Sequence, residues 1–331
     1  MNSSESASGS LAPTDQTTTS GLPSAVYKGN ALLIPVVFLM SALIIFGNMM
    51  TLLAIQKLPS LQTKSNVFVA SLAAADMMVG VVLIPYGLWL VPAIRQLVDE
   101  DISICLLLMS AGSSAVVISI LSLLLVALDR LVFISRPFFY QRVVTNRVIA
   151  AGVALPWTLG LTFGNSQWLI YAPTTHPPQC VVTYMLPEAY YKYAAPWMYF
   201  ASCSAVLCMY AHIAMIARRQ RLAIRKHNTV RPMVQVGSEK ITEKNWKAVK
   251  MMMTVFGVFF VCWTPRFVLY SAAGPQLDAW LPEIVYDLSL LLGLLNSGVN
   301  FLVYPAHNHE FRRAFKLILC CTTKEKLVFL A

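Results

Sequence analysis

The amino-acid sequence predicts an all-α membrane protein, in which a seven-transmembrane helix bundle is followed by a short amphipathic helix on the membrane surface. Of the 331 residues, 57% are hydrophobic and only 12% are charged, whereas soluble domains carry about 25% charged residues. Seven apolar stretches are each longer than the roughly 20 residues that a helix needs to cross a bilayer. Basic residues gather in every second connecting segment, which is the pattern that membrane insertion favours.

The apolar stretches define the predicted helices in order. Because lipid offers no hydrogen-bond partners, the backbone of each stretch must satisfy its own polar groups and is therefore helical. The predicted spans are residues 30–56, 66–92, 102–135, 148–171, 188–218, 246–273 and 280–306. The chain is thus divided into a tail (1–29), a helix bundle (30–306) and a terminal region (307–331).

The charge distribution predicts the orientation. A formal net charge of +10 could by itself suggest a nucleic-acid partner. Only Lys28, Arg95 and Lys192 fall in the predicted outer segments, however, and the long connection from about Arg219 to Asn245 is basic. We therefore predict a multi-pass plasma-membrane protein with an extracellular amino terminus and no nucleic-acid partner. The basic connection is either a solvated linker near anionic lipid or a surface that docks a partner.

The tail and the terminal region carry candidate modification sites. Residues 1–28 are rich in Ser and Thr and are expected to be disordered. Asn2 begins an Asn-Ser-Ser triplet, which is either a glycosylation site or unused. Cys320 and Cys321 are either palmitoylated or unmodified cytosolic thiols.

Residues after the seventh stretch predict the surface helix. Phe311, Phe315 and Ile318 follow an i, i+4, i+7 spacing, while Arg312 and Lys316 fall on other faces. Such a helix lies in the plane of the inner membrane surface.

The seven cysteines predict one disulfide and no metal site. Cys105 and Cys180 both fall on the predicted outer side, where the oxidising compartment allows a disulfide between them. Cys203, Cys208 and Cys262 fall within predicted spans and are interpreted as packing residues.

Ionisable groups inside predicted spans are costly and are therefore candidates for function. The surroundings of Asp76 suit a hydrated sodium ion or a water network, or else a protonated Asp76 capped by Asn48. Arg130 at the inner membrane edge pairs with Asp129 or swings out to meet a partner. Pro265 kinks the sixth span, as a moving part or as a static kink. The polar residues predicted within reach of Asp76 are Asn48, Ser119, Asn296, Ser297 and Asn300.

These features form a set of motifs in order along the chain. They are Gly47-Asn48, Leu72-Ala73-Ala74-Ala75-Asp76, Cys105, Asp129-Arg130-Leu131, Trp157, Cys180, Tyr210, Cys262-Trp263-Thr264-Pro265 and Asn300-Phe301-Leu302-Val303-Tyr304. Together they resemble the rhodopsin-like (class A) G-protein-coupled receptors over nearly the whole chain after the tail. The resemblance implies a receptor rather than an enzyme, with a heterotrimeric G protein, a small-molecule agonist, arrestin and receptor kinases as partners.

The resemblance also implies roles for individual residues. Arg130 would engage the G protein when the sixth helix swings out, and Asp129 would hold it at rest. Ile120 and Phe259 would form a packing switch, and Tyr210 and Tyr304 would bridge near Arg130 in the active state. The sodium and water site, the only cofactor site implied, would comprise Asp76, Ser119, Trp263, Asn296 and Asn300.

Four positions depart from the family pattern. Leu131 stands where Tyr is usual, Phe301 and Ser202 stand where Pro is usual, and Asn245 replaces the acidic lock partner of the sixth helix. Because the acidic partner is missing, we hypothesise raised basal activity.

The ligand is not determined by the sequence. Gly112 stands where amine receptors carry Asp, and Leu294 stands where opsins carry the retinal-binding Lys, so both ligand classes are disfavoured. The scaffold is most similar to adenosine receptors and the related melanocortin, cannabinoid and lysolipid receptors, through residues 71–76, 79–81, 84–85, 217–220 and 310–312. An adenosine-like ligand, a lipid ligand and activity without a ligand all remain open, and outside receptors a transporter is the main alternative.

The expected ligand pocket has a mostly apolar and aromatic wall. The predicted lining residues are Met109, Gly112, Ser113, Val116, Met198, Trp263, Arg266, Phe267, Tyr270, Tyr286 and Leu290. Arg266 could anchor an anionic head group, point away, or pair with Asp287 or Glu283, and the sequence favours pairing.

Overall fold

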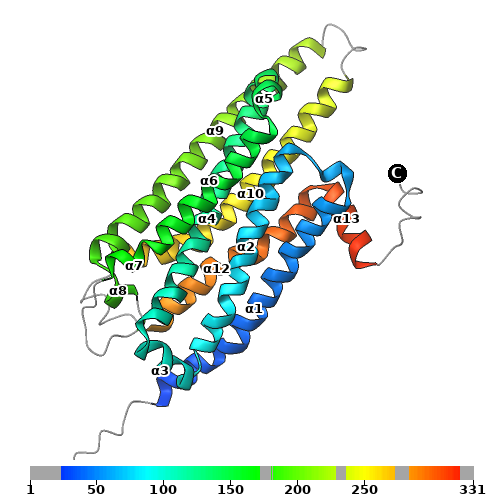
Figure 1. Ribbon diagram of the computed structural model, residues 1–331. Helices are drawn as coiled ribbons and strands as arrows, with labels where there is room; N and C mark the ends of the chain where they lie inside the picture. The colour runs from blue at the N-terminus through cyan, green and yellow to red at the C-terminus, as the bar shows by residue number, and fades with distance from the viewer. Residues whose placement is uncertain (1–23, 172–179, 181, 229–235, 273–282, 321–331) are drawn as a thin grey trace, which may run out of the picture.

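The computed structural model describes residues 24–171, 180, 182–228, 236–272 and 283–320. Within these residues seven helices are long and apolar enough to cross a membrane, and they run alongside one another as a bundle (Figure 1). They are α1 (Ser24–Lys57), α2 (Lys64–Trp89), α4 (Ile102–Ser135), α6 (Asn146–Asn165), α9 (Ala195–Asn228), α10 (Val236–Ala272) and α12 (Glu283–His307). The predicted seven-helix bundle is confirmed.

Short helices gather at the two ends of the bundle. At one end lie η1 (Pro59–Leu61), α5 (Pro137–Val143) and α13 (His309–Leu319), and at the other lie α3 (Pro92–Glu100), α7 (Gln167–Ile170) and α8 (Val182–Met185) (Figure 1). One turn of π-helix, η2 (Ala189–Ala194), leads into α9. Of these short elements, only α13 was predicted from the sequence.

α4 is the central helix, because it packs against α2, α6, α9 and α10. Its contact with α6 is close: a methyl group added at Gly160 would overlap Ile118, and one added at Gly164 would overlap Ser114. Small residues of this kind let two helix backbones approach each other inside a membrane. α1 and α12 also pack against each other and so close the ring.

The outer surface of the bundle is apolar as well as its core. On α1, for example, Leu39 and Phe46 are exposed while Val37 and Ile44 are buried. A water-facing surface rarely carries large contiguous apolar patches, whereas a lipid-facing one does. The fold is therefore that of a multi-pass membrane protein.

Three helix ends differ from the prediction. α1 begins at Ser24, inside the tail that the sequence predicts to be disordered. The predicted basic loop is largely helical, because α9 continues to Asn228 and α10 begins at Val236. Adding a residue to an existing helix costs much less than starting a new one, so helices extend beyond the apolar residues that define a span.

The predicted amphipathic helix is present as α13, and it packs against α1 and α12. Phe311 and Phe315 are buried, and the ring of Phe311 stacks on that of Tyr304 with centroids 5.3 Å apart. Arg312 is exposed and its guanidinium donates to the carbonyl oxygens of Pro305 and Ala306 at 3.0 and 3.2 Å. α13 is thus tied to the end of α12 by both its apolar and its basic face.

Candidate functional site

Asp76 lies in a buried polar cluster in the middle of the bundle. Its side chain is fully buried on α2. Ser119 Oγ and Ser297 Oγ donate to its Oδ1 at 3.2 and 2.8 Å, and Asn300 Nδ2 donates to its Oδ2 at 2.7 Å. These donors from α4 and α12 are buried too. Both carboxylate oxygens of Asp76 therefore accept hydrogen bonds although they are away from water.

Two predicted neighbours of Asp76, Asn48 and Asn296, form no hydrogen bond with it among the described contacts. The Asn48 amide donates to the carbonyl oxygens of Ile44 and Ser297, both at 3.0 Å, so the alternative in which Asn48 caps Asp76 is not supported. Asn296 belongs to the predicted sodium set, but the structure places the hydroxyl of Ser297 against the carboxylate. Ser297 was within the wider set of residues expected near Asp76.

The same region contains buried oxygen atoms that are available to a ligand. Among the described residues, the Oδ1 atoms of Asn48, Asn296 and Asn300 are buried without a hydrogen-bond partner. Hard cations prefer carboxylate, amide and hydroxyl oxygens, and buried water needs two to four polar partners. The residue set therefore fits a hydrated sodium ion or a small group of waters.

Asp129 and Arg130 form an ion pair at the end of α4, with Arg130 Nε 3.8 Å from Asp129 Oδ2. Asp129 is held by two further groups. Ser65 Oγ of α2 donates to Oδ2 at 2.6 Å, and the Tyr140 hydroxyl of α5 donates to Oδ1 at 2.7 Å. Burial raises the pKa of Tyr140 to about 12, so its hydroxyl remains a donor at neutral pH. Neither Ser65 nor Tyr140 was identified from the sequence.

The residues implied as an activation switch lie in the apolar core of the bundle. Ile120 and Phe259 are buried in the same apolar core, as are Tyr210 and Tyr304. In the part of the chain that the structure describes, the buried Tyr304 hydroxyl has no hydrogen-bond partner. The implied bridge between Tyr210 and Tyr304 is not among the described contacts.

The central part of α10 packs closely on α12. Trp263 is buried one turn from Phe267, with ring centroids 6.0 Å apart, and Pro265 lies between them in the helix. A methyl group added at Gly293 would lie only 2.6 Å from Trp263 Cε3. The α12 backbone therefore contacts the indole ring directly.

The departure at Phe301 has a clear packing consequence. The Phe301 ring lies against Gly47 of α1, where an added methyl group would fall 2.7 Å from Cε1 and closer still to two other ring atoms. Gly47 thus makes room for a bulky residue at a position where the family usually has proline.

Arg266 lies on α10 in the half of the bundle that carries α3 and α8, and its contacts differ from the predicted ion pair. Its guanidinium donates to the Tyr286 carbonyl oxygen at 2.9 Å and to the Tyr270 hydroxyl at 2.6 Å, and it stacks on the Tyr270 ring at 4.3 Å. Asp287, one of the two predicted partners, accepts from the Tyr86 hydroxyl at 3.2 Å. The side chain of Glu283, the other, lies outside the described residues. Within the described residues, the Tyr270 side chain and the Tyr286 carbonyl oxygen thus hold the guanidinium in place of the predicted carboxylate.

The other predicted pocket residues lie on α4, α9, α10 and α12. A methyl group added at Gly112 would meet no atom within 4 Å, so this position faces open space. The Ser113 hydroxyl accepts from Gln167 Nε2 at 2.6 Å, and Phe267 stacks on Tyr199 with centroids 4.2 Å apart. The remaining predicted wall residues are partly buried: Met109, Val116, Met198 and Leu290.

The disulfide between Cys105 and Cys180 is present, with a Cα–Cα distance of 5.5 Å. Cys105 belongs to a small apolar cluster in which Met185 and Leu186 are fully or almost fully buried and against which Met109 packs. Asp99 supports the disulfide, because the Cys180 backbone amide donates to its carboxylate at 3.0 Å.

Some predicted sites cannot be placed. Asn2 and Cys321 lie outside the described residues, as does the side chain of Asn245. Cys320 is exposed at the end of α13.

Comparison with known proteins identifies the family. A family model described as 7 transmembrane receptor (rhodopsin family) matches residues 47–304. The histamine H2 receptor of Cavia porcellus is 26% identical over 89% of this chain and 81% of its own length. The adenosine receptor A2b of Mus musculus is 27% identical over 88% and 90%, and the alpha-1D adrenergic receptor of Mus musculus is 25% identical over 85% and 56%. The chain belongs to the rhodopsin family of seven-transmembrane receptors and is a G-protein-coupled receptor.

Proposed function

We propose that this receptor binds an extracellular small molecule with an acidic group, and that Arg266 is its anchor. The observation that carries the proposal is the incomplete hydrogen bonding of the Arg266 guanidinium within the described residues. Its planar head is ordered by uncharged partners, Tyr270 and the Tyr286 carbonyl, and within the described residues its buried Nε has no hydrogen-bond partner. A guanidinium recognises carboxylate and phosphate groups through paired hydrogen bonds.

The ligand classes in the names of the relatives are less well supported. Amines need a negative partner, and the expected position holds Gly112, next to open space. An adenosine-like ligand is supported only by the similar scaffold. A lysolipid combines an acidic head with an apolar tail, and the aromatic wall around Phe267 and Tyr199 suits such a tail.

The signal would pass from this pocket to the opposite end of the bundle through α10. Movement of Trp263 against α12 would tilt the helix about Pro265, and the tilt would open a site beside Arg130 for the G protein. Asp129 would restrain Arg130 at rest. A sodium ion beside Asp76 would stabilise the resting packing, because it would bind the buried oxygens of α2, α4 and α12.

The proposal also includes the cellular location, the cytoplasmic partners and the covalent modifications of the receptor. The distribution of basic residues supports an extracellular amino terminus and a plasma-membrane location. Arrestin and receptor kinases would act at the cytoplasmic end, Asn2 would be glycosylated, and Cys320 and Cys321 would carry palmitate beside the membrane surface.

The decisive experiment measures G-protein dissociation in cells for each G-protein class, with adenosine, monoamines and lysolipids as test ligands. Arg130→Ala and mock-transfected cells are the controls for coupling. Signalling above mock without any ligand, lost in Arg130→Ala, would support the raised basal activity expected from Asn245. Basal signalling equal to mock would count against it.

The anchor is tested with an acidic agonist found in that panel. Arg266→Ala should abolish its response while Arg266→Lys, which keeps the charge, should retain part of it. Surface expression and basal signalling serve as the controls for folding. An unchanged dose response in Arg266→Ala would refute the anchor role and leave the receptor assignment intact.

A further inference from the structure

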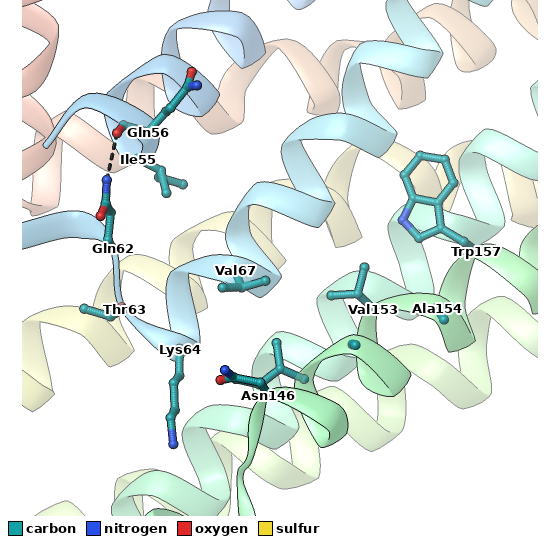
Figure 2. Close-up of a pocket in the computed structure, with 12 residues that line it drawn as sticks. Ile55, Gln56, Gln62, Thr63, Lys64, Val67, Asn146, Val153, Ala154 and Trp157 are labelled. Carbon is teal, nitrogen blue, oxygen red and sulfur yellow. Dashed lines mark hydrogen bonds between the residues drawn. The ribbon is translucent and has the colours of Figure 1, made fainter. Parts of the chain in front are cut away.

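A groove on the outer surface of the bundle is lined by residues of α1, α2 and α6. It has a volume of about 970 Å³ and runs between the end of α1, the start of α2 and the first half of α6 (Figure 2). Trp157 is one of its lining residues, and its indole nitrogen donates to Ser71 Oγ of α2 at 3.1 Å. This hydrogen bond fixes the indole ring of Trp157, which lies at the end of the groove away from Lys64.

The lining changes from polar to apolar along the groove. Gln62, Lys64 and Asn146 lie at the mouth, where α2 and α6 begin, whereas Val153 and Trp157 lie further along α6 (Figure 2). The mouth is at the end of the bundle that carries α5 and α13, which the distribution of basic residues assigns to the cytoplasmic membrane edge. A ligand of the groove would thus have a polar head at that edge and an apolar tail inside the bilayer.

The charge at the mouth is positive. Lys64 is exposed, and its Nζ donates to the Val144 carbonyl oxygen at 2.5 Å, so the ammonium is held at the rim. α2 begins at Lys64 and α6 at Asn146, and helix N-termini favour negative charge beside them. Of the lining residues that the structure describes, none is acidic.

We propose that this groove binds an anionic glycerophospholipid of the inner leaflet, with its headgroup phosphate at Lys64 and one acyl chain along α6 towards Trp157. A neutral sterol would use the apolar wall but would leave the cationic mouth without a partner. A soluble phosphate compound would use the mouth but leave the apolar wall exposed to the bilayer. Only a lipid with both parts matches the whole lining.

The headgroup contact is tested by lipid retention on the purified full-length receptor, with native mass spectrometry and dioleoyl phosphatidylserine or dioleoyl phosphatidylcholine as probes. The wild type should retain phosphatidylserine more strongly. A basic residue near a membrane surface contributes about 1 kcal/mol with anionic lipid, so Lys64→Gln should weaken phosphatidylserine binding about fivefold. Lys316→Gln removes an exposed lysine on α13, outside the groove, and should weaken phosphatidylserine binding less than Lys64→Gln does.

The tail contact is tested with a matched pair on α6. Ala150 lines the groove, whereas its neighbour Ala151 is exposed outside it. Ala150→Phe should fill the groove and reduce phosphatidylserine binding, and Ala151→Phe should leave it unchanged, with equal melting temperatures for the two variants. Equal retention of the two phospholipids, equal effects of the two lysine variants, or displacement of phosphatidylserine by cholesterol with no effect of Lys64→Gln would each overturn the proposal.

Discussion

Replacing Gly47 with alanine should destabilise the bundle, because the Phe301 ring occupies the space that the new methyl group needs. The added carbon would lie 2.7 Å from Cε1 and closer to two other ring atoms, well inside van der Waals contact. Overpacking of this kind costs about 1–3 kcal/mol. Alanine in a helix is otherwise favoured over glycine by about 0.8–1.0 kcal/mol, so the net loss should lie between about zero and 2 kcal/mol.

The sign of the effect should reverse when the ring is removed. In a Phe301→Ala background the methyl group meets no ring, so Gly47→Ala should stabilise the receptor by about 0.8–1.0 kcal/mol. The coupling between the two positions is then about 1–3 kcal/mol. The assay is the apparent melting temperature of the four purified receptors by tryptophan fluorescence, where 1 kcal/mol corresponds to about 2–4 °C for domains of 150–250 residues.

Gly257→Ala is the matched control, because a methyl group there meets nothing within 4 Å. It should raise the melting temperature by the same amount with or without Phe301. If Gly47→Ala has equal effects in both backgrounds, the Phe301 ring does not occupy the space beside Gly47 and the packing argument for this departure fails.

Three further predictions concern the other clusters. The wild type should melt at a higher temperature in sodium chloride than in choline chloride. Asp76→Asn removes the only charge among the described residues of its cluster, so this difference should disappear. Tyr140→Phe removes a donor to a carboxylate, a bond worth about 1.5–3 kcal/mol, and amide hydrogen exchange in α5 should accelerate at least about tenfold. Replacing Cys105 and Cys180 together with serine should destabilise the receptor by about 2–5 kcal/mol, measured as a lower melting temperature.

Each of these has a contrary outcome. A sodium response that persists in Asp76→Asn would place the ion elsewhere. Exchange in α5 equal to that of the wild type would mean that the contact with Asp129 does not hold this helix. A serine double variant as stable as the wild type would show that the apolar cluster at Met185 and Leu186 stands without the disulfide.

The spans could be predicted from the sequence because their cause is local. A run of apolar residues long enough to cross a bilayer is helical wherever it lies, and Asp76 and Arg130 are visible because charges are rare within such runs. Short helices and polar helix ends leave a weaker signal. α3 and α5 are short, and the extensions of α9 and α10 beyond the membrane have no apolar period that distinguishes them from a loop.

The contacts of the site could not be predicted as fully, because they join distant segments. Ser65 and Tyr140 reach Asp129 from α2 and α5, and nothing in their neighbours indicates this convergence. Arg266 shows a second limit. The acidic residues Glu283 and Asp287 are visible in the sequence, but the preference of the guanidinium for an aromatic ring and a carbonyl oxygen depends on the packing of α10 and α12.

The part of α10 that precedes Pro265 is long, so a small rotation at the proline produces a large displacement at Val236. At 1.5 Å per residue, the helix between Pro265 and Val236 is an arm of about 43 Å. A rotation of about 10° at the proline would move the far end by about 8 Å, whereas side chains one turn on the pocket side would move by only about 1 Å. A ligand that shifts side chains near Pro265 by less than the width of an atom would therefore displace the far end of α10 by several ångströms.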